Sequence, residues 1–438
     1  MLLIIVDDLR PGLGTYGNDI VKTPNIDRIA SRGVRFDRAY SQSPLCNPSR
    51  ASMLTGRYST QTDVWDNRTW FGAIHPDFVS LPHHFRRQGY TTLRAGKIYH
   101  RRMDEPEAWS EGSEPRAFQG ADNTEARGPR DEALDRVQPL DGDGESHRDY
   151  RNTTRAIELL ENHQKERFFL ALGLSKPHAP LAAPRRMLDL YDASAIPLPV
   201  DFARRPTVPP GFPRNSVPPR NNDLFIGRDA SPEEAREMIR GYYASTSYSD
   251  SNVGRVLDAL ERLGLRDETV IVFWGDHGYH LGEKGKWSKH DSLFEVGVRV
   301  PLIIASPHHE LSAGKASRRV VQSLDLYATL VDLCGLPRPP GVGGRSLRPL
   351  LEDPEATWNH PAYSVARLPN GIAASVRTER WRYASWSGGQ SMLFDHQNDP
   401  AETRNLANDP AHAAVARRMR GLLVGIPRWG VPLRVQSQ

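Results

Sequence analysis

The stretch Leu2-Leu3-Ile4-Ile5-Val6-Asp7-Asp8 joins five aliphatic side chains to two adjacent carboxylates. A short aliphatic run that stops at polar residues is typical of a strand buried on both faces of a parallel sheet. In open parallel sheets, ligands bind beyond the carboxyl ends of the strands. The stretch therefore predicts a central strand that carries Asp7 and Asp8 to the functional edge of the sheet.

Further apolar runs repeat this pattern along the chain. Three of them end in charged or imidazole side chains, and a fourth resembles another strand; they cover residues 91–95, 168–174, 269–274 and 300–305. Helical patterns lie between the runs at 23–33, with Thr23 as N-cap before Pro24, at about 150–161, and at 253–263. Alternating strands and helices predict an α/β fold with a large mixed, mainly parallel sheet sandwiched by helices.

The pattern changes near the end of the chain. Three short strands and a final helix are expected at 372–378, 381–386, 392–395 and 411–423. We therefore predict a catalytic α/β domain over residues 1–345 and a C-terminal subdomain with a small antiparallel sheet over 346–438. Two long irregular segments, 103–147 and 197–222, are expected to serve function, because long loops are uncommon in compact domains.

Composition narrows the classes of function. The chain has 57 basic and 53 acidic residues, a net charge of +4 and no long basic run, so nucleic acid is not an expected partner. Its two cysteines allow at most one disulfide. The apolar start is too short for a membrane span and lacks the features of a secretory leader. Localisation stays open between the cytoplasm and export with a leader missing from this sequence.

Polar residues follow every major strand of the predicted sheet. Lys97 and His100 follow the second strand, Lys176 and His178 the third, and Asp276 and His277 the fourth. Together with Asp7 and Asp8 they would meet at one edge of the sheet. Three carboxylates and one imidazole favour a hard divalent cation, Ca²⁺ or Mg²⁺, over zinc.

The segment Cys46-Asn47-Pro48-Ser49-Arg50 contains a cysteine in a polar setting. We expect Asn47 to cap a helix that Pro48 begins, which would put Cys46 just before the helix N-terminus. Exposed amides and the helix dipole favour an anion there, and Arg50 adds a positive charge one turn on. Taken alone, the segment is more typical of a loop cysteine beside a capped helix than of an anion site.

The longer motif, in which Cys46-Asn47-Pro48-Ser49-Arg50 is followed by Leu54-Thr55-Gly56-Arg57, resembles the type I sulfatase signature. A formylglycine-generating enzyme recognises that signature. The resemblance extends from Met1 to about Ala407, and its other landmarks are Thr23 to Asp27, Gly96-Lys97, Asp276-His277-Gly278 and Asn398 to Leu406. Within this family the segments 96–100, 175–180 and 276–289 are similar to iduronate 2-sulfatase-like enzymes. The resemblance implies the alkaline-phosphatase-like sulfatase fold.

The resemblance also implies a mechanism centred on Cys46. Conversion to formylglycine and hydration would give a geminal diol; one hydroxyl attacks sulfur and expels the alcohol, and the second releases sulfate and restores the aldehyde. The implied ligands of Ca²⁺ are Asp7, Asp8, residue 46, Asp276 and His277. Many sulfatases have asparagine where this chain has His277, so Mg²⁺ or another divalent metal remains an alternative.

Other roles carried over from the family concern cationic and imidazole side chains. Arg50 would hold the diol, and Lys97 and Lys289 would bind sulfate oxygens. His100 would orient the nucleophile or accept its proton, and His178 would protonate the leaving oxygen, although these two roles could be exchanged. Lys176 could contact a substrate carboxylate. Three more side chains could either line the pocket or pack in the core: Trp65, Trp70 and His280.

Alternatives to this function stay open from the sequence. A phosphomonoesterase or phosphodiesterase of the alkaline phosphatase superfamily can share the sheet, the metal ligands and formylglycine. A binding protein with a sulfatase-like fold would bind metal or sulfated glycans without hydrolysis. The expected substrate is a small-molecule or saccharide sulfate ester, of which a glycosaminoglycan-derived uronate is one candidate, while choline sulfate and aryl sulfates are others.

Overall fold

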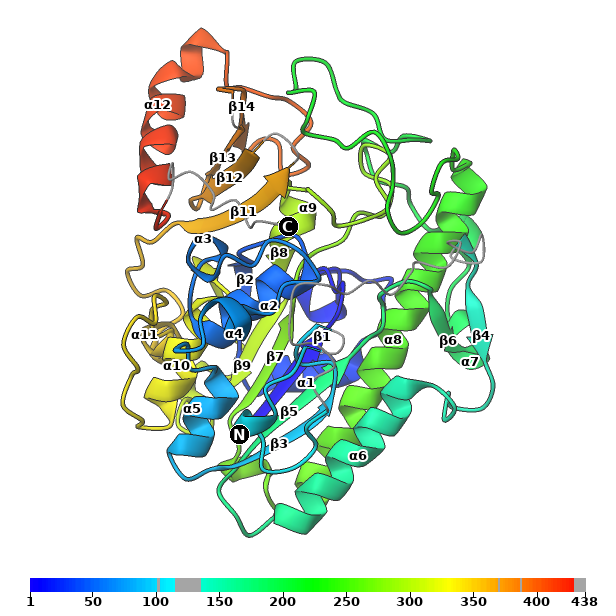
Figure 1. The fold of residues 1–438 in the computed structure, drawn as a ribbon. Coiled ribbons are helices and arrows are strands. Elements are labelled where there is room, and N and C mark those ends of the chain that lie inside the picture. The colour runs from blue at the N-terminus through cyan, green and yellow to red at the C-terminus, as the bar shows by residue number, and fades with distance from the viewer. Residues whose placement is uncertain (101–102, 115–134, 369–370, 387, 429–438) are drawn as a thin grey trace.

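The computed structural model describes residues 1–100, 103–114, 135–368, 371–386 and 388–428. A mixed sheet forms its centre (Figure 1). Its strands lie in the order β10 (Ala316–Gln322), β2 (Val34–Tyr40), β9 (Leu302–Ala305), β7 (Ile271–Gly275), β1 (Leu2–Val6), β5 (Phe168–Leu174) and β3 (Thr91–Gly96), with β8 (Arg299–Val300) beside β2. Strands β8 and β9 run antiparallel to their neighbours, whereas the other pairs are parallel. The predicted mixed, mainly parallel sheet is confirmed.

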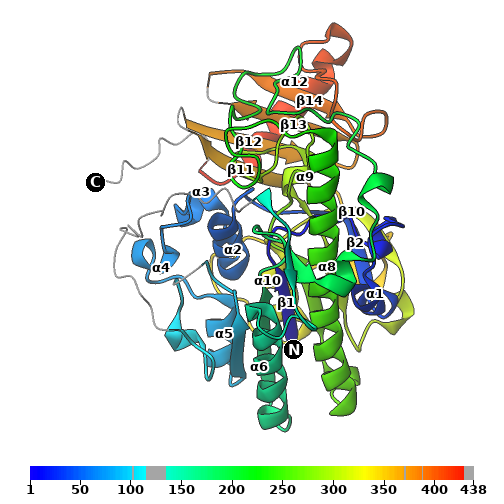
Figure 2. The same cartoon turned by 90° about the vertical axis from the view of Figure 1, so that its right-hand side faces the viewer.

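Strand β1 is buried on both faces, and its side chains alternate between two cores. Leu3 and Ile5 pack in one core, under α2 (Cys46–Thr55), α5 (Leu81–Arg87), α10 (Asp325–Leu333) and α11 (Arg348–Glu352). Leu2, Ile4 and Val6 pack in the other, under α1 (Pro24–Ser31), α6 (Arg148–His163) and α8 (Pro232–Arg262). Figure 2 shows α6 and α8 side by side. Each fully buried aliphatic side chain of this kind contributes about 1.5–3 kcal/mol, so β1 is held firmly in the middle of the sheet.

Shorter elements complete the main domain. They are α3 (Ser59–Thr62), α4 (Phe71–Ile74), α7 (Arg185–Leu188), α9 (Glu295–Val298) and the paired strands β4 (Gln138–Leu140) and β6 (Ala182–Pro184). Single 3₁₀ turns of the main domain lie at Gly14–Tyr16, Pro106–Ala108, Ala193–Ala195, Arg266–Glu268 and Glu310–Ser312, and two more lie near the C-terminus at Pro410–His412 and Leu423–Gly425. No helix within the described ranges has both the length and the apolar character that a membrane span requires.

Several expected boundaries differ from the structure. Helix α8 begins at Pro232, well before residue 253, because Ser231 and Glu234 form a capping box there. The expected strand at 300–305 is divided into β8 and β9 at Pro301, which has no N–H to donate. Helix α1 ends at Ser31, and Thr23 does not cap it with its side chain: the Thr23 hydroxyl accepts a hydrogen bond from Gly14 N instead (3.0 Å).

A separate antiparallel sheet lies near the C-terminus, covered by α12 (Ala413–Leu422) (Figure 1). Its strands are β11 (Ala362–Leu368), β12 (Gly371–Arg377), β13 (Trp381–Trp386) and β14 (Ser391–Asp395). The antiparallel strands were expected, except β11. The boundary between residues 345 and 346 stays a prediction, and Leu350 and Leu351 of α11 pack in the core that contains Leu3.

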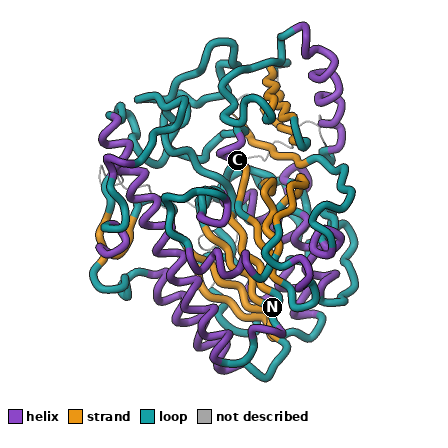
Figure 3. The backbone as a smooth tube through the Cα atoms, turned by 180° about the vertical axis from the view of Figure 1, so that it is seen from behind, coloured by secondary structure: helices purple, strands orange, loops and turns teal. Residues whose placement is uncertain are grey.

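The irregular segment between α7 and α8 lies beside this C-terminal sheet (Figure 1 and Figure 3). Phe212 packs against Phe394 with ring centroids 5.6 Å apart, and Asn405 Nδ2 donates a hydrogen bond to Gly211 O (2.8 Å). The other expected loop, 103–147, contains a 3₁₀ turn and β4, and its residues 115–134 lie outside the described residues. The segment 197–222, which is rich in proline, therefore packs against the C-terminal sheet.

A network of buried charges holds the C-terminal sheet against the main domain. Glu295 of α9 accepts hydrogen bonds from Tyr40 OH (2.8 Å), Arg377 Nε (3.2 Å) and Arg382 Nη2. Arg382 Nε also pairs with Glu402 (2.8 Å). Burial alone would raise the pKa of Glu295, but the two arginines and the His396 imidazole hold that pKa well below its usual value. Glu295 of α9 thus connects β2 with the hairpin of β12 and β13, which is distant from both in the sequence.

Replacing Glu295 by alanine should destabilise the protein strongly. Arg377 and Arg382 would stay buried without that partner, and breaking a buried ion pair from one side costs about 3–5 kcal/mol. Chemical denaturation of the variant measures this loss. The matched control is Glu352→Ala, which removes an exposed pair with Arg348 (3.1 Å) and should cost less than about 1 kcal/mol. Equal stability of the two variants would show that Glu295 does not hold the two parts together.

Candidate active site

The carboxyl ends of β1 and β7 carry three buried carboxylates. Asp7, Asp8 and Asp276 are each at most 1% exposed. Asp8 has a φ of 60°, in the left-handed region that aspartate tolerates better than most residues, and its N–H donates to Asp276 Oδ1 (3.1 Å). The turn after β1 therefore brings adjacent carboxylates together with the carboxylate that follows β7.

Cys46 lies fully buried beside these carboxylates, at the first residue of α2. Its Sγ is 3.4 Å from Asp7 Oδ1 and 3.2 Å from His277 Nε2. The expectation that Asn47 caps this helix is wrong: the helix begins at Cys46 after Leu45, and the Asn47 amide donates to Asp66 O (2.7 Å) and Thr69 O (2.6 Å). Cys46 is still at the helix N-terminus, where the dipole favours negative charge.

The residues around Cys46 fit a divalent cation. Ligand atoms of Asp7, Cys46, Asp276 and His277 all lie within 4.8 Å of one another, and Asp8 forms a second such group with Cys46 and His178. Asp8 Oδ1 has no hydrogen-bond partner among the described residues, although it is buried. The His277 Nδ1–H donates to Gly278 O (2.9 Å), which leaves Nε2 as a ligand. This oxygen-rich set suits a hard cation.

Three cationic side chains pair with the same carboxylates. Arg50 Nε is 2.8 Å from Asp276 Oδ2, Lys289 Nζ is 2.9 Å from Asp8 Oδ2, and Lys97 Nζ contacts Asp7 Oδ2. Burial would raise the pKa of Asp7, but these positive charges hold it well below its usual value. Burial raises the pKa of Asp8 to about 7 against the charge of Lys289. Burial and the charge of Asp7 raise the pKa of the Cys46 thiol well above its usual value.

Close packing of backbone determines the place of Lys97. The residue follows β3, and its N–H donates to Gly173 O of the neighbouring strand (3.2 Å). Gly96 has a φ of 79°, and a Cβ on Gly173 would lie 2.1 Å from Lys97 O. Only glycine fits there, so the two glycines allow Lys97 to turn over the strand ends toward Asp7.

The two candidate histidines differ in what they contact. His178 Nε2 is 4.0 Å from Asp8 Oδ2, and its Nδ1–H donates to Ala179 O (2.5 Å). Burial and the charge of Lys289 lower the pKa of His178 well below its usual value. His100 is 5% exposed and follows Lys97 by three residues. His178 therefore lies beside the carboxylate cluster, while the place of His100 in the site remains a prediction.

Other residues considered from the sequence have different positions. Lys176 Nζ donates to His178 O (2.7 Å) and Pro180 O (2.6 Å), so it supports the turn that carries His178. Trp65 and Trp70 pack against hydrophobic cores, and buried His280 contacts Ser292 Oγ (2.6 Å). These contacts favour packing over substrate binding.

Asp223 is a residue of the site that sequence patterns did not reveal. It is 9% exposed, and its carboxylate lies 3.4 Å from Lys289 Nζ and 3.9 Å from His290 Nε2. Lys289 therefore lies between Asp8 and Asp223. Asp223 follows the proline-rich segment as an isolated acid, so no spacing or periodicity signalled it.

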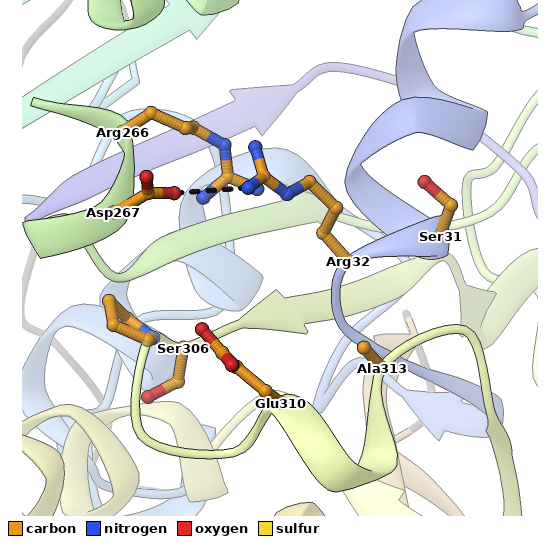
Figure 4. A pocket seen from close by; sticks show the side chains of 8 residues that line it. Ser31, Arg32, Arg266, Asp267, Ser306, Glu310 and Ala313 are labelled. Atoms are coloured by element: carbon orange, nitrogen blue, oxygen red, sulfur yellow. Dashed lines mark hydrogen bonds and ion pairs between the residues drawn. The ribbon is translucent and has the colours of Figure 1, made fainter. Parts of the chain in front are cut away.

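A distinct pocket of about 280 Å³ lies at the opposite end of the sheet (Figure 4). Arg32 pairs there with Asp267 (3.0 Å), next to Arg266 and Glu310. Ser306 follows β9, whose last residue is opposite the start of β7. Two arginines and two carboxylates balance in charge, so this pocket resembles neither an anion site nor the cation site around Cys46.

Comparison with known proteins identifies the class of this hydrolase. The profile described as "Sulfatase" matches residues 1–336, and the profile "N-sulphoglucosamine sulphohydrolase, C-terminal" matches residues 282–427. This chain belongs to the sulfatase family, as its sequence predicted, and it is a sulfatase enzyme.

Curated relatives and solved structures agree with this assignment. Iduronate 2-sulfatase of Homo sapiens is 32% identical over 507 residues, covering 93% of this chain and 91% of that protein. Choline-sulfatase of Rhizobium meliloti is 29% identical, covering 94% and 82%. The crystal structure of a phosphonate monoester hydrolase of Agrobacterium radiobacter has a TM-score of 0.78 at 23% identity, covering 97% and 94%, and shows the shared fold. The predicted resemblance to iduronate 2-sulfatase-like enzymes is confirmed.

Binding of one divalent cation should stabilise the protein. Adding Ca²⁺ to chelator-treated protein should raise the free energy of unfolding by about 2.7 kcal/mol at a hundred times the Kd, because only the folded chain assembles the ligands. Denaturation with and without Ca²⁺ or Mg²⁺ measures this increment. Asp8→Asn should lose most of it, whereas Asp258→Asn, at an exposed ion pair with Arg28, should keep it. An equal increment in both variants would exclude Asp8 as a ligand.

Proposed function

We propose that this sulfatase hydrolyses a sulfate monoester on a saccharide, using formylglycine at position 46 and a divalent cation, Ca²⁺ in preference to Mg²⁺. The observation that carries the proposal is the set of Asp7, Asp8, Asp276 and His277 around Cys46, in a chain aligned over 93% of its length with an iduronate 2-sulfatase. A formylglycine-generating enzyme would act on the chain during maturation.

The cation would be held by Asp7, Asp8, Asp276, His277 and the oxygen that replaces the Cys46 sulfur. When bound, it would neutralise sulfate oxygens and activate the nucleophilic oxygen. Formylglycine supplies two hydroxyls on hydration, one to attack sulfur and one to release sulfate afterwards. An unmodified Cys46 would lack this second hydroxyl and could not follow the same course.

Arg50 positions the reacting oxygen in this mechanism. Its guanidinium is fixed by Asp276 (2.8 Å) and by Ile98 O (3.0 Å), and it is 1% exposed. Arg50 Nη2 has no hydrogen-bond partner among the described residues and lies 3.8 Å from Asp7 Oδ1. This free donor would hold an oxygen on residue 46.

Lys97 and Lys289 would bind the sulfate oxygens as point charges. Each ammonium contacts a carboxylate of the site, Asp7 or Asp8. In the proposed mechanism each would turn from that oxygen to one on the substrate. Asp223 would keep Lys289 at the site while it does so. The carboxylates would therefore neutralise the two ammonium groups before the substrate binds, and the ammonium groups would stabilise the sulfate after it binds.

His178 is the proposed proton donor to the leaving alcohol. Its Nδ1 is engaged with Ala179 O, so Nε2 is the nitrogen that faces Asp8 and the site. A bound sulfate ester would favour protonation of Nε2 through its negative charge. That proton would then pass to the alcohol oxygen as the S–O bond breaks. His100 would accept the proton released when the aldehyde reforms.

Sulfated saccharides are the substrate class that the relatives favour. One solved structure is described as a complex with its substrate D-glucosamine-2-N,6-O-disulfate, with a TM-score of 0.77 at 22% identity, covering 97% of this chain and 96% of that one. Choline-sulfatase is also similar, so choline sulfate belongs in the substrate test. The iduronate 2-sulfatase similarity makes a 2-sulfated uronate the first candidate.

Mature protein should carry an aldehyde at position 46. After coexpression with a formylglycine-generating enzyme, the mass of the peptide containing Cys46 should show that oxygen has replaced sulfur and that two hydrogens have been lost, which distinguishes the aldehyde from an alcohol. Cys46→Ala should fold normally but lose activity by about 10⁴-fold or more, because the nucleophile is absent. Circular dichroism controls for folding, and Cys334→Ala controls for loss of a cysteine. Near-normal turnover by Cys46→Ala would refute the mechanism.

A matched pair of substrates should separate the two esterase activities. With 4-nitrophenyl sulfate and 4-nitrophenyl phosphate at equal concentration, we expect kcat/KM to favour sulfate by about tenfold or more, equivalent to about 1.4 kcal/mol. Disaccharides with a terminal 2-sulfated uronate or a 6-sulfated glucosamine, together with choline sulfate, then rank the alcohols. Faster cleavage of the phosphate would support the phosphomonoesterase alternative.

A further inference from the structure

A second pocket, of about 300 Å³, lies at the edge of the main sheet next to the C-terminal sheet. Five arginines line it, and we call it the arginine pocket: Arg35, Arg38, Arg299, Arg318 and Arg377. They come from strands β2, β8, β10 and β12. The pocket therefore joins basic side chains from both sheets, and it shares no residue with the site around Cys46.

Charge is not balanced in the arginine pocket. Its carboxylates are Asp37, which pairs with Arg35 (2.8 Å), and Glu295, which pairs with Arg377 (3.2 Å). Five arginines against two carboxylates leave an excess of three positive charges. The His396 imidazole also lines the pocket, and it contacts Glu402 (2.9 Å). The pocket in Figure 4, by contrast, has as many carboxylates as arginines.

Two of these arginines supply most of the free positive charge. Arg38 donates to the backbone oxygen of Arg318 (2.8 Å), which brings the two residues together. Neither guanidinium makes an ion pair with any residue that the structure describes. Arg299 Nε is held by Asp37 O (2.8 Å) and lies 4.0 Å from Glu295 Oε1. Like charges that line one pocket repel one another, and a bound anion would relieve that repulsion.

We propose that the arginine pocket binds a sulfate oxyanion, either free or carried on a saccharide chain. Guanidinium groups match tetrahedral oxyanions through paired N–H donors and keep their charge at every physiological pH. Arg38 and Arg318 provide the primary contacts, and Arg299 provides the next. The buried Arg377–Glu295 pair forms the floor of the pocket and is not available for exchange.

Isothermal titration calorimetry at constant ionic strength tests the proposal, with sodium sulfate and a heparin-derived octasaccharide as separate ligands. The variant Arg38→Ala/Arg318→Ala removes the free guanidiniums. Arg417→Ala/Arg418→Ala on exposed positions of α12 removes the same net charge elsewhere. Hydrolysis of 4-nitrophenyl sulfate should be unchanged in both, since neither touches the site around Cys46. The conservative variant Arg38→Gln/Arg318→Gln replaces the alanine variant if that one melts more than a few degrees below the parent protein.

We expect the pocket variant to bind sulfate at one class of site about tenfold or more weakly, and the α12 variant to bind sulfate unchanged. This result would identify free sulfate as a sufficient ligand. A loss confined to the octasaccharide also supports the pocket and identifies chain-borne sulfate as the ligand. Unchanged binding of both ligands by the pocket variant overturns the proposal. The titrations use protein that also carries Cys46→Ala, which lacks the nucleophile and cannot turn over the octasaccharide. Hydrolysis is measured on protein with Cys46 intact, so failure of the proposed sulfatase chemistry would be seen separately, in that assay.

Discussion

The mutual neutralisation of buried charges beyond β1 is the constraint on which the rest of the structure depends. Three carboxylates, Asp7, Asp8 and Asp276, lie in an environment where unpaired charges are strongly unfavourable. Three cationic side chains offset them. Two of those cations are lysines, which a substrate sulfate would draw away from the carboxylates. The carboxylates would then need another counter-charge, which a divalent cation supplies.

The sheet meets this constraint through strand register. Val6 pairs with Leu174 on one side and with Gly275 on the other, so three strands end at the same level. Hydrogen bonds continue past the ends: Asp7 N donates to Leu174 O (3.1 Å), and Asp276 N donates to Val6 O (3.2 Å). The carboxylates are consequently held by strands whose residues are all buried. Side chains built on such rigid elements keep their geometry better than those on loops.

The sequence predicted the parts of the molecule that depend on local pattern. The aliphatic runs identified β1, β3, β5 and β7, and the polar residues that follow them include most of the clustered side chains. Strand β2 was not predicted because the strands of the main sheet were identified from continuous aliphatic runs, whereas in β2 Val34 and Phe36 alternate with Arg35 and Asp37. The role of Asp223 was not predicted because only tertiary packing brings this residue to Lys289. Patterns reveal what a segment buries, whereas pairings between distant segments depend on packing.

Arginine side chains in three different electrostatic settings serve three different purposes: they position other groups, stabilise the fold, or bind a ligand. Arg50 is buried against Asp276 and serves to position other groups. Arg377 and Arg382 are buried against Glu295, where the pairing joins two sheets. Arg38 and Arg318 line one pocket near the surface and have no carboxylate partner among the described residues. Folding alone gives no reason to gather like charges in a concave surface, because their repulsion opposes it. A ligand of opposite charge provides that reason.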